Sequence, residues 1–198
     1  AGLGLERVTS GALAHRTVVA AMIPLLALCA CALALDLGRR MGVALVPRLW
    51  CALLLAIGTQ LLTYARLFYT EIAILFFIIL ALVAFVRARE KDARAPLRWW
   101  LVAGASLAGV TACHYGDVAL SAALWAVFAL SLWRERGAPA ARRLAALGAL
   151  SGVPVLAGLA ILAVNRAHFG SPYSTGYHFY YRSLYGIDMK IVDEHGGE

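Results

Sequence analysis

The chain alternates long apolar stretches with short segments that hold most of its charges. Apolar runs long enough, or nearly so, to cross about 30 Å of hydrocarbon predict helices over 17–37, 43–64, 68–87, 99–115, 117–133 and 144–164. Only His114 to Asp117 separates the fourth range from the fifth, so these two ranges form a tight helical hairpin or one long kinked element. The pattern predicts an all-α fold, a polytopic transmembrane bundle of about six spans.

Basic residues predict how this bundle is oriented. Most of the 18 Lys and Arg residues follow the first, third and fifth spans, in connections that share one side of the membrane: Arg39, Arg40 and Arg48, then Arg87, Arg89, Lys91, Arg94 and Arg98, then Arg134, Arg136, Arg142 and Arg143. By the positive-inside rule this side is cytoplasmic. Residues 1–16 and the aromatic-rich tail 165–198 then flank the bundle at 17–164 as extracytoplasmic segments.

Composition supports a membrane protein over a soluble one. The chain is 62% hydrophobic and 15% charged, whereas soluble domains are about 25% charged. The net charge of +7 is spread between apolar segments, so lipid headgroups, and not nucleic acid, are the expected anionic neighbours. The four cysteines lie in apolar runs and predict neither a disulfide framework nor a zinc site. No P-loop, GxSxG, HExxH or CxxC motif is present.

Glu71 is notable because it opens an apolar range that continues to Arg87 without another charge. A carboxylate at a helix N-terminus is stabilised by the helix dipole, which is a purely structural interpretation. Together with Arg66 at the same boundary, Glu71 can also hold a divalent cation or a phosphate. Both interpretations stay open at this stage.

Other polar residues on the predicted extracytoplasmic side also have two interpretations. Asp117 is a favoured residue type for the N-cap of the fifth helix, and it also brings a second carboxylate to the membrane boundary. His114 and His168 are either simple hydrogen-bonding residues or ligands of a phosphate or metal. The guanidinium of Arg166 suits a phosphate, although it can equally extend to lipid headgroups. Tyr173 and Tyr177 are either interfacial anchors or platforms that stack on a sugar ring.

Three segments resemble a known family. They are residues 37–42 (LGRRMG), residues 58–71 (GTQLLTYARLFYTE) and residues 165–177 (NRAHFGSPYSTGY), the last of which is similar to the N-x-x-x-FGSP-x-x-TGY run after a late helix in many bacterial members. In order and spacing, these segments resemble the GT-C membrane glycosyltransferases of the protein-mannosyltransferase and aminoarabinose-transferase type. The resemblance covers most of residues 17–180.

The resemblance implies an enzyme that transfers a sugar, with inversion, from a polyprenyl-phosphate donor to an acceptor hydroxyl on the outer side of the membrane. In such enzymes an acidic residue of the first extracytoplasmic loop is the general base. A second carboxylate, near a later span, helps to bind a divalent ion (Mg or Mn) or the lipid phosphate, and Glu71 matches this second position. Residues 1–16 offer only Glu6, in a dissimilar context. We therefore expect the base upstream of residue 1, in a larger enzyme of which this chain is a fragment.

The predicted site collects residues at one membrane interface, because the cleavable bond of a polyprenyl-phosphate sugar lies at headgroup level. The residues expected to bind the donor phosphate are Arg66, Glu71, His114, Asp117 and Arg166, and those expected to contact substrate are Tyr69, Tyr173 and Tyr177. Glu71 is also the expected metal ligand. The resemblance places the protein in the bacterial inner membrane, with the acceptor unspecified.

Functions of other classes remain as alternatives. A transporter or lipid flippase would also use polar residues in a helical bundle, although transporters usually place ionisable groups near the midplane. A noncatalytic membrane subunit is the third alternative. The position of most acids at one interface favours the glycosyltransferase.

Overall fold

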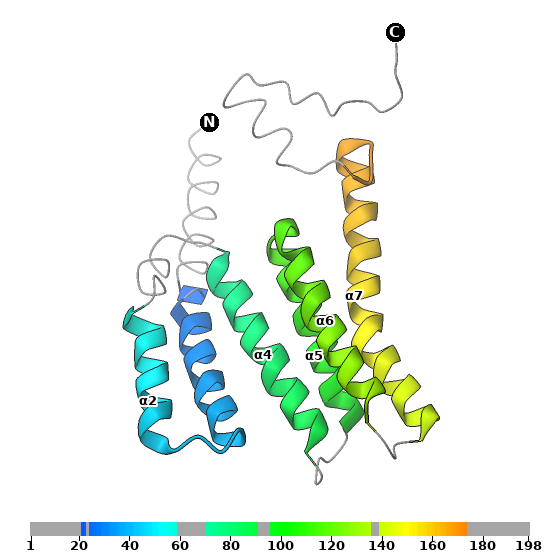
Figure 1. The fold of residues 1–198 in the computed structure, drawn as a ribbon. Coiled ribbons are helices and arrows are strands. Elements are labelled where there is room, and N and C mark those ends of the chain that lie inside the picture. Colours follow the sequence, from blue (N-terminus) through cyan, green and yellow to red (C-terminus); the bar gives the residue numbers. More distant parts are fainter. Residues whose placement is uncertain (1–20, 23, 59–69, 91–95, 136–138, 174–198) are drawn as a thin grey trace, which may run out of the picture. The chain divides into compact units, whose positions relative to one another are not determined.

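The structure, a computed structural model, describes residues 21–22, 24–58, 70–90, 96–135 and 139–173 (Figure 1). A first helix covers 24–40. It is followed by α2 (Leu45–Leu53), a π-helical turn η1 (Leu54–Gly58), α4 (Glu71–Arg89), α5 (Pro96–Cys113), a 3-10 turn η2 (Tyr115–Asp117), α6 (Val118–Trp133) and α7 (Ala140–Phe169). These described ranges contain helices, turns and connections but no strand, which confirms the predicted all-α bundle.

Each predicted span overlaps an observed helix. The main differences are at the ends: α4 continues to Arg89, and α7 runs from Ala140 to Phe169, so that the expected start of the tail at 165 lies in its last turns. Because α5 ends at Cys113, α6 begins at Val118 and Ser121 Oγ donates to the backbone oxygen of Leu107, the alternative of a tight hairpin is correct and that of one long kinked element is wrong. The parts of the predicted spans at 17–20 and 59–64 lie outside the described residues.

Length and composition identify two helices of the described ranges as able to cross a membrane on their own. They are α4 and α7. The stretches Leu45–Ala56 and Val118–Trp133 are also apolar but shorter. Large apolar side chains are exposed on α2, α6 and α7, among them Trp50, Leu130 and Leu156, as expected for helices whose surroundings are lipid.

The chain forms two compact units, Ala1–Pro154 and Val155–Glu198. The boundary falls at Pro154, inside α7, where proline cannot donate the usual backbone hydrogen bond of a helix. We therefore describe the contacts of each unit separately.

The core of the first unit lies where α4, α5, α6 and the first part of α7 meet. Aromatic rings fill its centre: Phe85 stacks on Phe128, with ring centroids 4.3 Å apart, and meets Trp100 edge-on at 5.8 Å. Small residues such as Ala103 and Ala146 pack around these rings. The Nε1 of Trp125 adds a hydrogen bond to Ser151 Oγ at 3.1 Å and so joins α6 to α7.

Gly104 permits a close approach between α5 and α7. A Cβ at this position would lie 2.4 Å from the backbone oxygen of Leu150, a distance that side chains do not tolerate. Such contacts between small residues are how helices associate in a medium without a hydrophobic driving force. Gly148 is a second glycine in a predicted span, but a Cβ there would meet nothing within 4 Å. Only the first of these two glycines is thus required by packing.

We expect Gly104→Ala to lower the stability of the purified protein, because the new methyl group must push the two backbones apart. The expected cost is about 1–3 kcal/mol, the usual range for overpacking. Thermal unfolding in detergent measures it. Gly148→Ala is the matched control and should leave stability unchanged or raise it slightly, since alanine favours helix by about 1 kcal/mol. Equal melting temperatures for the two variants would contradict this role of Gly104.

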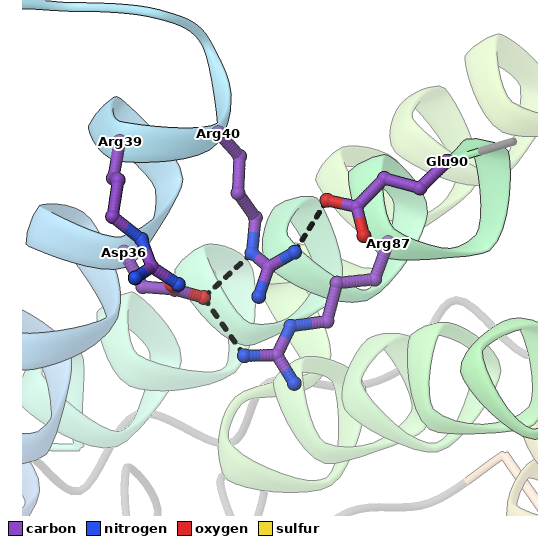
Figure 2. Close-up of polar contacts among 5 residues, drawn as sticks. All are labelled: Asp36, Arg39, Arg40, Arg87 and Glu90. Carbon is purple, nitrogen blue, oxygen red and sulfur yellow. Dashed lines mark hydrogen bonds and ion pairs between the residues drawn. The ribbon is translucent and has the colours of Figure 1, made fainter. Parts of the chain in front are cut away.

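A network of ion pairs joins the first helix to the end of α4 (Figure 2). The Asp36 carboxylate accepts from Arg40 Nε at 2.8 Å and from Arg87 at 2.9 Å, and Arg39 approaches its other oxygen at 3.2 Å. Arg40 also pairs with Glu90. The hydrogen bond to Asp36, opposed by burial and aided by Glu90, raises the pKa of Arg40 above its usual range. The two helices are therefore held together at this end by ion pairs.

Arg87 also packs on an aromatic ring. Its guanidinium carbon lies 4.4 Å from the centroid of Trp99, a cation–π contact with the start of α5. The network consequently connects three helices, namely the first helix, α4 and α5.

Asp36→Asn should destabilise the protein, because it leaves Arg40 and Arg87 half-buried without their shared carboxylate. Breaking a fully buried pair costs about 3–5 kcal/mol, and the partial exposure here reduces our expectation to roughly 1–3 kcal/mol. Arg39→Gln is the control, since the Arg39 side chain is 67% exposed whereas that of Arg40 is 14% exposed. In thermal unfolding, the melting temperature of Asp36→Asn should lie well below that of Arg39→Gln. The reverse order would refute the stabilising role of the ion-pair network.

Candidate functional site

The two ends of the first unit differ in charge. α4 and α5 are antiparallel, because Phe85 meets Trp100 near one end, whereas Phe77 faces Gly109 toward the other. The start of α4 therefore lies at the same end as the turn between α5 and α6, as Figure 1 also shows. The arginine network lies at the opposite end, where α4 finishes. This arrangement agrees with the sides predicted from the basic connections.

Glu71 is the first residue of α4 and is exposed. Thr70 precedes it at the N-cap, and the backbone oxygen of Thr70 accepts from Ile74 at 3.0 Å, although its side chain makes no capping bond. The next residue, Ile72, is almost fully buried against Leu26, Leu55 and neighbouring side chains. The helix start is thus anchored by apolar packing, while its carboxylate faces outward where the helix dipole stabilises negative charge.

His114 and Asp117 form a pair in the turn between α5 and α6. Nδ1 of His114 lies 3.3 Å from Oδ2 of Asp117, and the amide of Asp117 donates to the His114 oxygen at 3.1 Å. Asp117 occupies the N-cap position of α6, as one interpretation predicted, but its side chain makes no capping hydrogen bond. The carboxylate is instead directed to the imidazole. The imidazole group can in general accept or donate a proton and, when protonated, bind an anion.

Glycine at position 116 allows this pair to form. A Cβ on Gly116 would lie 2.8 Å from the His114 ring, so a side chain there would displace the imidazole. Deeper in the hairpin, Ser121 Oγ donates to the backbone oxygen of Leu107 at 3.1 Å, and Thr111 Oγ1 lies 3.2 Å from Ser121 Oγ. These hydrogen bonds hold the two helices in register and thereby fix the position of the turn.

Contacts in the second unit explain residues 165–172 (NRAHFGSP), the first part of the segment 165–177 that resembles the family. Asn165 is buried, and its Nδ2 donates to the backbone oxygen of Pro172 at 3.2 Å, so that the chain folds back on the end of α7. Gly170 makes this reversal possible with φ of +75°, a conformation that favours glycine, and its amide closes the helix on the Arg166 oxygen at 3.0 Å. Arg166, on the last turn of the helix, and Tyr173, after the reversal, are both exposed.

The predicted site residues thus fall into three groups. The structure brings Glu71 and the His114 to Asp117 pair to one end of the first unit. Arg166 and Tyr173 lie at the end of α7 in the second unit. Arg66, Tyr69 and Tyr177 lie outside the described residues.

Glu71 offers a single carboxylate as a ligand for the expected divalent ion. Among the residues that the structure describes, no group of three or more His, Cys, Asp and Glu side chains could hold a metal ion. A metal site at Glu71 would need ligands from other parts of the chain or from the substrate phosphate. The Mg or Mn ion therefore stays a prediction.

The arginine network was not predicted. A local signal existed, because a carboxylate three and four residues before two arginines forms helical ion pairs. Arg87 and Glu90, in contrast, are about 50 positions away in sequence. Only the parallel packing of the first helix and α4 brings Arg87 to Asp36 and Glu90 to Arg40.

Comparison with known proteins identifies the family. The family model of dolichyl-phosphate-mannose-protein mannosyltransferases matches residues 9–169, most of the chain. The chain belongs to this family. No curated protein and no solved structure gives a significant match.

Membership confirms the resemblance to GT-C enzymes and, with it, the prediction of an integral membrane protein. The family implies a membrane glycosyltransferase that uses a polyprenyl-phosphate sugar donor. This favours the glycosyltransferase prediction over the transporter and the noncatalytic subunit. The matched range includes the first helix, α2, the α4 to α6 core and the whole of α7.

Proposed function

We propose that this mannosyltransferase-family chain binds the phosphate of a polyprenyl-phosphate sugar at the extracytoplasmic end of its bundle, where the sugar passes to an acceptor hydroxyl. The observation that carries the proposal is the separation of charge between the two ends. Glu71 and the His114 to Asp117 pair occupy one end of the first unit, and the arginine network occupies the other. A bacterial plasma membrane is the proposed location, with the arginine end in the cytoplasm.

The chemistry of the donor explains why polar groups are needed at this level. Transfer breaks the bond between the anomeric carbon and the phosphate oxygen and forms a bond from that carbon to the acceptor oxygen. The phosphate departs with its bonding electrons, and the acceptor proton passes to a general base. The departing group therefore gains negative charge at the headgroup level, where prepositioned donors and cations stabilise it.

Each proposed residue has a defined task. The His114 imidazole donates to a phosphate oxygen, and Asp117 orients the ring. The guanidinium groups of Arg66 and Arg166 bind the phosphate as forks. Glu71 would hold a divalent ion, which would supply positive charge to stabilise the departing phosphate.

Aromatic side chains are proposed to hold the sugar. Tyr173 is exposed after the chain reversal that Asn165 and Gly170 build, so its ring is accessible to a ligand. Stacking of a tyrosine ring against a sugar face buries apolar C–H groups of the sugar. Tyr69 and Tyr177 are proposed for the same role.

Substitution of the two carboxylates tests this function. In the full-length protein, Glu71→Gln and Asp117→Asn should each slow sugar transfer from a polyprenyl-phosphate donor by roughly 10- to 1,000-fold, the range for loss of one electrostatic contact in an active site. The initial rate of transfer in a membrane preparation is the measurement. Both variants keep the shape of the side chain, so the fold should persist.

Glu90→Gln is the matched control for these variants. It also removes one carboxylate charge, but from the residue that follows α4 at the arginine end. The new amide oxygen can still accept a hydrogen bond from Arg40. Transfer by this variant should equal that of the parent. If Glu71→Gln retained the parent rate as well, the proposed role of Glu71 would be wrong.

A further inference from the structure

We propose that the arginine-rich end of the bundle binds an anionic glycerophospholipid, with part of an acyl chain in a cavity beneath Arg142 and Arg143. This site is separate from the proposed donor site, because it lies at the opposite end of the first unit. It concerns a lipid of the surrounding bilayer and not the sugar donor.

The cavity lies where four helices finish or begin at this end. Its volume is about 160 Å³. Buried apolar side chains form its inner wall: Ala88 at the end of α4, Trp100 in α5, Leu132 in α6 and Ala146 in α7. An apolar cavity with these walls suits a hydrocarbon segment and offers no favourable contact to a free inorganic anion.

The outer part of the cavity carries charge. Arg142 and Arg143 of α7 and Glu135 after α6 line it, so the positive charges exceed the negative one. Arg143 donates weakly to the Trp133 oxygen at 3.5 Å, and its guanidinium lies 5.9 Å from the centroid of the Trp133 ring. Arg142 is exposed, and the described residues provide no ion pair to it. Its guanidinium therefore has donors available for a phosphate.

The surroundings indicate that this cavity meets the bilayer at headgroup level. Trp133 and Leu144 beside it are among the most exposed large apolar side chains of the described residues. Tryptophan and arginine together are typical of the membrane interface, where apolar rings meet lipid tails and cations meet phosphates. A phospholipid satisfies both parts of the cavity at once, with its acyl chain inside and its phosphate on the arginines.

Lipid binding to the purified full-length protein tests this proposal. Native mass spectrometry in detergent should show phosphatidylglycerol retained in preference to phosphatidylcholine. Removing one surface cation weakens anionic lipid binding by roughly fivefold, so Arg142→Gln should reduce retention of phosphatidylglycerol by that factor, and the double variant with Arg143→Gln should reduce it further. Retention of phosphatidylcholine should not change.

Two further variants separate a defined site from diffuse charge. Arg39→Gln removes an exposed arginine at the same end but outside the cavity and should leave retention at the parent level. Ala145→Phe keeps both arginines but fills the cavity, which Ala145 lines from an exposed position, and should reduce retention. If Arg39→Gln weakened binding as much as Arg142→Gln, or Ala145→Phe had no effect, the proposed site would be refuted. Retention of polyprenyl phosphate in place of phosphatidylglycerol would refute it equally.

Discussion

Charged side chains cannot remain in the hydrocarbon layer without partners, because an isolated charge there costs several kcal/mol. This constraint organises the first unit. Between Glu71 and Arg87, α4 is entirely apolar, and its ion pairs begin only where the helix approaches its end. Asp36, which lies in the first helix, is tolerated because Arg40 and Arg87 share its carboxylate. The contact with Arg87 also joins the first helix to α4, so the ion pairs that compensate the charge of Asp36 also stabilise helix packing.

Segregation of charge leaves the two ends of the bundle suited to different tasks. The arginine end combines compensated ion pairs with a cavity that has cations at its rim. The opposite end presents the carboxylate of Glu71 and the pair of His114 with Asp117. In a family that handles a lipid-linked sugar phosphate, polar groups of this kind at headgroup level are where donor chemistry is expected. The tight hairpin between α5 and α6 keeps its pair in place through buried hydroxyl contacts.

Sequence patterns predicted the apolar spans and their connections well, because long apolar runs have few alternatives in a membrane. They could not predict which small residues matter: Gly104 and Gly148 look equivalent in sequence, yet only Gly104 faces the backbone of another helix. Asp117 has the residue type of an N-cap, but its carboxylate turns to His114. The pairing of Asp36 with Arg87 depends on tertiary packing and leaves no local signal.

The most direct test of this account is the side of the membrane on which the two ends lie. Single cysteines at Thr70 and Ala140, introduced into a variant without the native cysteines, can be labelled in intact cells with a maleimide that does not cross the membrane. The account predicts labelling of Thr70→Cys from outside, with Ala140→Cys reacting only after the cells are opened. Labelling of Ala140→Cys from outside and protection of Thr70→Cys would contradict it.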